Sequence, residues 1–232
     1  MKYKHIFFDL DRTLYDFDES TKITFLELYE KFRMKENGVH SFDEFLELYK
    51  KNNYALWSQY REGKIKKKFL NVERFHVTLL HFGVDDRAFA GRFAADYLRM
   101  SPQNFALFPN VSEVLDYLKS KKRYTLHIIT NGFEEVQNIK LQANQLDAYF
   151  TTVTTSEEAG AKKPNPKIFH FALQKAGATP EESLMIGDDY EVDIVGARSV
   201  NIDQILFSPS ERPHKVGDTH VIKNLLEIKS IL

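Results

Sequence analysis

The stretch Ile6-Phe7-Phe8-Asp9-Leu10-Asp11-Arg12-Thr13-Leu14 decides the fold. Its dense apolar residues before a polar turn predict a strand buried on both faces, as in the middle of a parallel sheet. The strand ends at Asp9 and Asp11, which lie two residues apart, so their side chains start on the same face of the extended chain. Two ionised carboxylates held together repel each other unless a cation or a proton offsets their charge. We therefore expect a hard metal ion at this strand end.

The composition is that of an ordinary globular protein of 232 residues, of which 43% are hydrophobic and 28% charged. The formal net charge of -1 gives no support to a nucleic-acid-binding surface or a polybasic membrane patch. Cysteine is absent, which excludes disulfides and thiolate metal sites. No signal-peptide pattern precedes the first strand and no apolar run is long enough to span a bilayer, so we expect a cytoplasmic protein.

Helical periodicity follows the first strand, from about Asp18 to Met100. Ser41, followed three residues later by Glu44, has the spacing of a helix-capping box. No run in this segment has the pattern of a strand. The apolar residues recur at helical spacing, as in Ile23, Leu26, Tyr29, Phe32, Phe42, Phe45, Leu48 and Tyr49. We predict an all-helical insertion over residues 17–100.

Alternating helices and strands begin at Pro109, which is the pattern of parallel βαβ units. The expected fold class is α/β, a three-layer Rossmann-like parallel-sheet core formed by residues 1–16 and 101–232 and interrupted by the helical insertion. The expected strands after the first cover residues 124–130, 150–155, 183–186, 203–207 and 219–222, and the expected helices cover 111–121, 133–143, 166–176 and 192–199, followed by a terminal helix.

Polar residues follow the strands of the predicted core. Because parallel strands bring their carboxyl ends to one edge of a sheet, these residues should converge there. Carboxylates, a hydroxyl, an amide and an ammonium at one edge form a site for a metal ion and a phosphoryl group. The residues concerned are Asp9, Asp11, Thr130, Asn131, Lys162, Lys163, Asp188 and Asp189.

These strand ends resemble the four ordered motifs of the haloacid dehalogenase-like hydrolase superfamily. The motifs are Asp9-Leu10-Asp11-Arg12-Thr13, Thr130 after an apolar strand, Lys163 in Lys163-Pro164-Asn165-Pro166-Lys167-Ile168-Phe169, and Gly187-Asp188-Asp189 with Asp193. A lone Asp-x-Asp is weak evidence, whereas four motifs in order across the whole core are strong evidence.

The resemblance implies an aspartyl-phosphate mechanism. Asp9 would attack phosphorus, and Asp11 would protonate the leaving oxygen and then take a proton from water. Thr130 and Lys163 would contact the phosphoryl oxygens, with main-chain N–H groups at the Asp11 and Asn131 turns, next to Gly132, cradling the same group.

The resemblance also implies a Mg2+ site. Asp9, the main-chain carbonyl of Asp11, and Asp188 would hold the ion, and Asp193 is a further predicted metal residue that would support it through water. Asp189 and Asp193 have a structural alternative, which is to hold the loop.

The insertion resembles the first type of cap in this superfamily, which closes over the site and selects the leaving group. The segment around Asn53 and Trp57, followed by Leu70 and Arg74, is similar to the cap of house-cleaning pyrimidine 5'-nucleotidases. The core segments Ile129 to Phe133 and Ser156 to Gly160 resemble the same subgroup. Asn53, Trp57 and Arg74 would then bind a base, although aromatic residues at helical spacing also pack cores.

Three further residues have alternative interpretations. Thr130 is also suited to capping the helix expected at residue 133, and Lys163 is also suited to an exposed loop. Arg12 departs from the Gly, Asp or Asn that the superfamily commonly has there. It is a candidate for a substrate contact or for a salt bridge to the insertion.

The expected function is a Mg2+-dependent phosphatase for nucleoside 5'-monophosphates with a pyrimidine preference. A phosphatase or phosphomutase for small sugar phosphates is the alternative, and a non-catalytic binding protein is a remote one. A dehalogenase is disfavoured by the resemblance, because the dehalogenases of the superfamily lack an acid at the position of Asp11. The expected partner is a small phosphorylated metabolite, with no nucleic-acid polymer and no membrane.

Overall fold

A computed structural model describes residues 2–104, 106–210 and 219–232. The chain divides into two compact units. One, the sheet unit, comprises Met1–Phe17 and Phe105–Leu232, and the other, the helical unit, comprises Asp18–Asn104. Within the described residues, none of the helices combines the length and the apolar character needed to cross a membrane.

A parallel sheet forms the middle layer of the sheet unit. Its strand order is β3-β2-β1-β4-β5-β6, and every neighbouring pair is parallel. The fold class predicted from the sequence is confirmed. The strands are β1 (His5–Phe8), β2 (Thr125–Thr130), β3 (Phe150–Thr155), β4 (Ser183–Gly187), β5 (Asp203–Phe207) and β6 (His220–Ile222).

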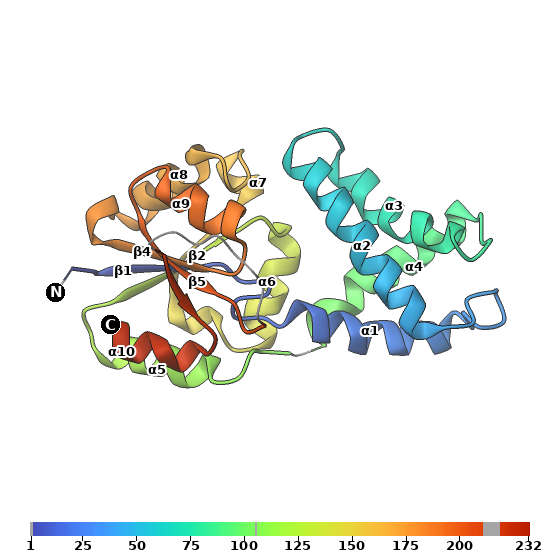
Figure 1. The fold of residues 1–232 in the computed structure, drawn as a ribbon, viewed down its shortest axis with the longest axis horizontal. Coiled ribbons are helices and arrows are strands. Elements are labelled where there is room, and N and C mark those ends of the chain that lie inside the picture. Colours follow the sequence, from blue (N-terminus) through green and yellow to red (C-terminus); the bar gives the residue numbers. More distant parts are fainter. Residues whose placement is uncertain (1, 105, 211–218) are drawn as a thin grey trace. The chain divides into compact units, whose positions relative to one another are not determined.

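Helices cover both faces of this sheet (Figure 1). Ile6 and Phe8 of β1 belong to the hydrophobic cluster shared with α5 (Val111–Ser120), α6 (Glu134–Ala143) and α10 (Ile228–Ile231). Phe7 points to the opposite face and belongs to the cluster shared with α7 (Ser156–Ala159), α8 (Pro166–Ala176) and α9 (Gly196–Arg198). Since successive side chains of a strand alternate between faces, the three consecutive apolar residues Ile6, Phe7 and Phe8 allow β1 to lie between two helical layers.

The helical unit has its own aromatic core. It contains α2 (Phe42–Arg61), α3 (Lys67–Leu80) and α4 (Arg87–Met100). It also contains α1 (Phe17–Lys31) except for its first residue. Ser41 caps α2 by accepting a hydrogen bond from the Glu44 N–H at 3.2 Å. Phe25 lies at the centre of this core, with ring contacts to Phe45, Tyr49, Phe75, Phe93 and Tyr97.

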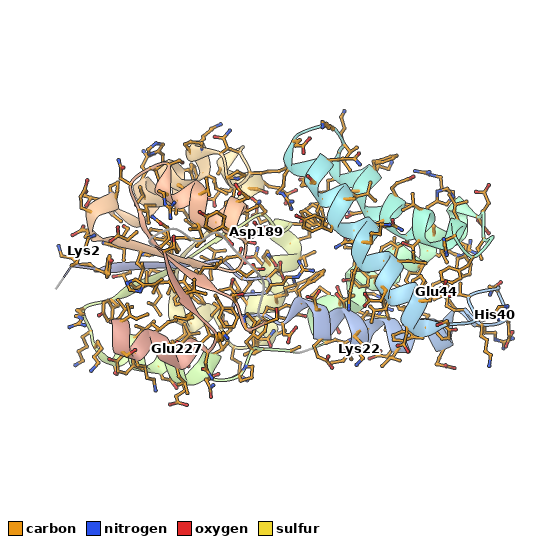
Figure 2. All side chains as sticks on the ribbon, in the orientation of Figure 1. Lys2, Lys22, His40, Glu44, Asp189 and Glu227 are labelled. Atoms are coloured by element: carbon orange, nitrogen blue, oxygen red, sulfur yellow. The ribbon has the colours of Figure 1, made fainter. Side chains whose placement is uncertain are left out.

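Charged side chains lie on the outside of both units. Figure 2 labels Lys2 and Glu227 on the sheet unit and Lys22, His40 and Glu44 on the helical unit, all of them exposed. Most charged side chains are at the surface, as is usual for a globular chain.

The helix expected over residues 192–199 differs from the structure. A π-helical turn, Tyr190–Val195, leads into α9. Asp189 begins this turn by accepting hydrogen bonds from the N–H groups of Glu191 and Val192, both at 3.1 Å. The wider turn carries Asp193 inward to a position that is 1% exposed. Such π turns often occur at functional sites.

Two histidines lie side by side on β1 and β2. His127 is fully buried, its Nε2 is 3.1 Å from His5 Nδ1, and its Nδ1 is 2.8 Å from the Thr152 hydroxyl. The His127 ring also stacks on Phe7, with ring centroids 4.7 Å apart. Burial, with a smaller contribution from the neighbouring His5, lowers the pKa of His127 to about 4.

Replacing His127 with Gln tests what this buried imidazole contributes to stability. Between pH 6.5 and pH 4 the unfolded chain binds more protons at this residue than the folded protein, so stability falls as the pH falls through this range. We expect the wild type to lose about 2 kcal/mol more than His127→Gln between about pH 7 and about pH 5, measured by urea unfolding. His5 is present in both proteins, and equal losses would contradict the assignment.

Candidate active site

The site lies at the carboxyl ends of β1 and β4, which are adjacent at the centre of the sheet. Consecutive strands diverge to opposite sides here, which is the switch point where open α/β sheets bind ligands. The register sets Phe8 beside both Ile128 and Ile186, and the Asp9 N–H continues the ladder with a 2.9 Å hydrogen bond to the Ile186 carbonyl. The backbone of Asp9 is therefore fixed by the sheet itself.

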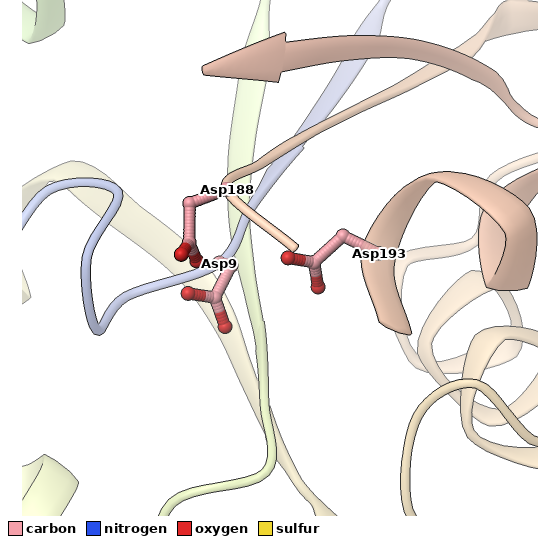
Figure 3. Close-up of side chains that lie close together, drawn as sticks. All are labelled: Asp9, Asp188 and Asp193. Atoms are coloured by element: carbon pink, nitrogen blue, oxygen red, sulfur yellow. The ribbon is translucent and has the colours of Figure 1, made fainter. Parts of the chain in front are cut away.

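Three carboxylates converge at this edge. One oxygen from each of Asp9, Asp188 and Asp193 lies within 4.8 Å of the others. Figure 3 shows these three side chains close together. Burial raises the pKa of Asp9 to about 7, which Lys163 opposes and Asp193 increases. Burial also raises the pKa of Asp188 well above its usual value, and the charges of Asp9 and Asp193 add to this effect. Hard oxygen ligands that repel one another when ionised suit a divalent metal ion.

Lys163 lies beneath this cluster and is 1% exposed. Its ammonium donates to Asp9 Oδ1 at 2.6 Å, to Asp193 Oδ1 at 2.6 Å and to the Ile129 carbonyl at 2.8 Å. Burial alone would lower the pKa of Lys163, but the charges of Asp193 and Asp9 outweigh it and hold that pKa above its usual value. The alternative of an exposed loop lysine is wrong.

The second oxygen of Asp9 is less constrained. Asp9 Oδ2 is contacted by the Thr13 hydroxyl at 3.5 Å, which is the outer limit of a hydrogen bond. Asp9 therefore has one oxygen fixed by Lys163 and a second one available to a ligand.

Glycine at position 187 is required by Asp193. A Cβ atom at Gly187 would lie 2.4 Å from Asp193 Cγ. The Asp193 Oδ2 atom in turn accepts a hydrogen bond from the Asp189 N–H at 3.1 Å. Since the Asp189 carboxylate caps the π-helical turn, the structure gives Asp189 the loop-holding contacts anticipated as one alternative from the sequence.

Asn131 supports the loop that carries Lys163. Its side-chain amide donates to the Lys163 carbonyl at 2.9 Å and accepts from the Lys163 N–H at 2.8 Å. These two hydrogen bonds occupy both ends of the amide, so the substrate contact predicted for Asn131 is left to its main-chain N–H. Because Asn131 directly follows β2, it couples the end of that strand to the position of the buried ammonium.

Thr130 does not cap α6. The N-cap residue of that helix is Phe133, which makes no side-chain capping hydrogen bond. Thr130 Oγ1 instead accepts hydrogen bonds from the Gly132 N–H at 3.0 Å and from Gln137 Nε2 at 2.7 Å. A hydroxyl oxygen has two acceptor positions, so the Thr130 hydrogen is left to act as a donor. A Cβ atom at Gly132 would lie 2.0 Å from Gln137 Nε2, which gives that glycine a steric role.

Asp11 lies apart from the carboxylate cluster and contacts α6. Its Oδ2 accepts from Gln137 Nε2 at 2.8 Å, and its Oδ1 forms a short ion pair with Lys140. Neither α6 residue was predicted from the sequence. Their spacing of three residues on a helix that begins just after a strand end was the available signal.

Arg12 has a left-handed backbone with φ of 66°, which is unusual for a residue with a side chain. Its guanidinium lies 4.7 Å from the centroid of the Phe17 ring. The positive charge of Arg12 also opposes the rise in the pKa of Asp188 that burial causes. Arg12 thus adds positive potential to the carboxylate cluster.

The predicted base-binding residues lie in the helical unit. Arg74 and Asn53 are buried, and Arg74 Nη1 donates to Asn53 Oδ1 at 3.2 Å. The Arg74 guanidinium also lies 5.2 Å from the Tyr97 ring centroid. Trp57 is half-buried and meets Tyr60 edge-on, with ring centroids 5.5 Å apart. The Asn53 and Arg74 side chains thus take part in packing, whereas Trp57 keeps accessible surface.

A family model described as haloacid dehalogenase-like hydrolase matches residues 6–207. The match covers most of the chain and includes all the strand ends of the site. The chain belongs to this family of hydrolases. The resemblance inferred from the motifs is confirmed.

Several relatives have named activities. Pyrimidine 5'-nucleotidase PynA of Streptococcus pneumoniae is 33% identical over 211 residues, which are 90% of this chain and 85% of PynA. Pyrimidine 5'-nucleotidase YjjG of Escherichia coli is 29% identical over 236 residues, covering 100% of this chain and 99% of YjjG. A glyceraldehyde 3-phosphate phosphatase of Methanothermobacter thermautotrophicus is 33% identical over 244 residues, with 99% of each chain covered. With the family match, these relatives identify the chain as a phosphoric monoester hydrolase.

A solved structure supports the fold. The HAD-hydrolase YfnB of Bacillus subtilis, in a crystal form bound to magnesium, has a TM-score of 0.88 and 23% sequence identity, covering 100% of this chain and 99% of that chain.

Asp188→Asn tests whether the carboxylate cluster holds a divalent metal ion. A ligand that binds only the folded protein stabilises it by about 2.7 kcal/mol when its concentration is about 100 times its dissociation constant. We expect such a stabilisation of the wild type, measured by thermal unfolding with and without Mg2+, and its loss in Asp188→Asn. Without metal the variant should be at least as stable as the wild type, because it removes one of three repelling carboxylates.

Asp189→Asn is the matched control for this experiment. Its amide oxygen can still accept the two N–H groups that begin the π-helical turn. We expect this variant to retain the Mg2+ response. A full response in Asp188→Asn would rule out the cluster as the metal site.

Proposed function

We propose that this hydrolase is a Mg2+-dependent phosphatase that acts through an aspartyl phosphate on nucleoside 5'-monophosphates, with a preference for pyrimidines. The observation that carries the proposal is the pairing of Asp9 with the buried Lys163 ammonium beside two further carboxylates. This arrangement orients one oxygen of Asp9, supplies positive charge next to it and offers ligands to a metal ion.

Asp9 is the nucleophile of the first displacement. Its Oδ2 forms a bond to phosphorus while the ester P–O bond breaks, and the electron pair of that bond leaves with the ester oxygen. Asp11 donates a proton to the leaving oxygen, so an alcohol departs. The donor hydrogen of Thr130 and the Lys163 ammonium offset the negative charge of the phosphoryl oxygens.

Water completes the second displacement. It attacks phosphorus while the bond to Asp9 breaks, and Asp11 accepts a proton from the attacking water. Inorganic phosphate is released, and Asp9 and Asp11 return to their starting protonation states. Asp11 thus serves as acid and then as base.

The residues present fit a magnesium ion. Asp9, Asp188 and the Asp11 main-chain carbonyl would hold it, and Asp193 supports Lys163 and the loop while adding negative charge. When bound, Mg2+ neutralises negative charge and polarises a phosphoryl oxygen. It would also counter the burial and the repulsion between carboxylates that raise the pKa of Asp9 and Asp188.

The substrate class rests on the relatives and on the helical unit. Two relatives named as pyrimidine 5'-nucleotidases match nearly the whole chain. Trp57 provides accessible aromatic surface on which a base can stack. Asn53 lies one helical turn before it on α2, and Arg74, on the neighbouring α3, donates to Asn53. The helical unit acts in this proposal as the cap that selects the leaving group. The proposed partner is a small phosphorylated metabolite.

A sugar-phosphate phosphatase is the second candidate. The glyceraldehyde 3-phosphate phosphatase relative is as similar in sequence as PynA and is covered over its whole length. The motifs of the sheet unit serve either substrate, so the choice depends on the leaving group.

A substrate panel with the purified protein tests the function. We expect phosphate release from pyrimidine nucleoside 5'-monophosphates to exceed release from purine nucleotides and from triose or hexose phosphates, and to stop when a chelator removes the metal. Asp9→Asn should lower the rate about a thousandfold or more, because the nucleophile is lost. Circular dichroism and thermal unfolding serve as the control for folding.

Each arm of the panel has its own contradicting result. Turnover that persists in excess chelator would refute the metal dependence, and near-normal turnover by Asp9→Asn would refute the nucleophile. Release from sugar phosphates alone would favour the second candidate.

Trp57→Ala tests the role proposed for the helical unit. Stacking of a base on an aromatic ring is worth about 1–3 kcal/mol, so we expect KM for a pyrimidine nucleotide to rise about tenfold. The rate with a small phosphate ester that lacks a base should stay within about twofold. Tyr54→Ala is the matched control, because Tyr54 lies on the same helix and is 67% exposed. A uniform loss on all substrates would point to packing instead.

A further inference from the structure

We propose that Gln137 and Lys140 position the carboxylate of Asp11 for its proton transfers during catalysis. The inference rests on the proposed function, in which Asp11 is the acid and then the base. It assigns to α6 a role in the reaction, beyond covering the sheet.

The first argument is that both oxygens of Asp11 are held. Gln137 Nε2 donates to Oδ2 at 2.8 Å, and the Lys140 ammonium donates to Oδ1 in a short ion pair. A carboxylate fixed at both oxygens has a defined plane and rotamer. Proton transfer requires such fixed geometry more than it requires affinity, because donor and acceptor must approach within hydrogen-bond reach.

The second argument is that Lys140 is buried for no evident structural purpose. It is 4% exposed, and its ammonium lies 4.6 Å from the Tyr15 ring centroid and 5.4 Å from that of Phe17. Lysine is among the residues least often buried, and a buried ion pair contributes little to stability once desolvation is counted. The aromatic rings prevent the ammonium from turning away, so its charge stays on Asp11.

The third argument concerns the amide of Gln137, which is fully buried. Its two N–H donors go to Asp11 and to the Thr130 hydroxyl, at 2.8 Å and 2.7 Å. Its oxygen has no hydrogen-bond partner among the residues that the structure describes. An unpaired buried oxygen is costly, so the amide is oriented for its donors at the expense of its acceptor.

Gln137 thereby links two chemical groups. By donating to Thr130 it fills the second acceptor position of that hydroxyl and leaves the Thr130 hydrogen to point to a ligand. By donating to Asp11 it sets the acid and base at a fixed place relative to that hydrogen. One side chain therefore aligns the group that handles the proton with a group that contacts the phosphoryl oxygens.

The test measures how fast two esters release their leaving groups in a single turnover. Release of the leaving group reports the first displacement alone. The first ester is the best alkyl phosphate of the substrate panel, whose leaving oxygen needs a proton. The second is p-nitrophenyl phosphate, whose leaving group departs as a stable anion. We expect Lys140→Met to slow the alkyl ester about tenfold or more and to slow the aryl ester less than about threefold. Gln137→Met also releases the Thr130 hydroxyl, so it should slow both esters, and the alkyl ester by the larger factor.

A double-mutant comparison separates positioning from a general effect on the fold. In an Asp11→Ala background, Lys140→Met should cause no further loss on the alkyl ester, because the group that it positions is gone. Lys140→Arg should recover part of the rate. Lys119→Met is the matched control, since Lys119 also lies against an aromatic ring, 5.2 Å from the Tyr149 centroid, and donates to the Ala148 carbonyl. This control should leave both rates unchanged.

Equal losses on the two esters, or additive losses in the Asp11→Ala background, would overturn the inference. If Lys140→Met does not fold, Gln137→Met, which keeps the ion pair, decides the question. A result that overturns the positioning role of Gln137 and Lys140 can be told apart from failure of the proposed function. That failure would appear as activity in Asp9→Asn, or as an inactive wild type, and would overturn both.

Discussion

The buried ammonium of Lys163 is the interaction on which the site depends. It joins Asp9 after β1, the carbonyl of Ile129 in β2 and Asp193 in the π-helical turn. These three segments are distant in sequence and meet only because the parallel sheet brings its strand ends together. One ammonium faces three carboxylates that lie within 4.8 Å of one another, so the site keeps an excess of negative charge. Since buried ion pairs are weak contributors to stability, this charge distribution is better explained by metal and phosphoryl chemistry.

The residues around Lys163 show how the fold keeps such a site in place. Asn131 holds the main chain of Lys163 through two hydrogen bonds, and Gly187 leaves the space that Asp193 occupies. Asp189 begins the turn that carries Asp193 inward. None of these contacts involves an atom that reacts in the proposed mechanism, yet each fixes Lys163 or its partner Asp193. The motif positions therefore divide into residues that perform chemistry and residues that orient them.

Much of the fold could be predicted from the sequence because local signals and the global arrangement agree. The strands over residues 150–155 and 203–207 and the helix over 166–176 match the structure at both ends. The last of these begins with Asn165 as its cap and Pro166 in its first turn, a pair of local signals that leaves little ambiguity. The π-helical turn at Tyr190–Val195 could not be predicted, because its width is set by the tertiary contacts of Asp193 with Lys163 and the Asp189 N–H.

The candidate site was predictable only in part, for the same reason. Motif order points to Asp9, Thr130, Lys163 and Asp188. Asp9 and Asp188 directly follow strands, Thr130 ends one, and Lys163 lies in the loop before α8. Gln137 and Lys140 lie in the middle of a helix and resemble ordinary helix residues. Only the folded structure shows that this face of α6 meets the end of β1. The amide of Asn131 is a related case, because its hydrogen bonds to Lys163 cross a gap of 32 residues that no local pattern encodes.

The structure changes the argument from which the sequence analysis started. Two carboxylates at one strand end need positive charge nearby, and a single metal ion is the simplest source. In the folded protein the two side chains diverge: Asp9 pairs with Lys163, and Asp11 pairs with Lys140. Each carboxylate thus has its own ammonium before any metal is considered. The remaining demand for a cation comes from Asp188 and Asp193, which join Asp9 in the buried cluster. In the proposed mechanism, the separation of the two acids lets Asp9 act as the nucleophile beside the metal ligands while Asp11 handles protons. The separation arises because α6 supplies the second lysine.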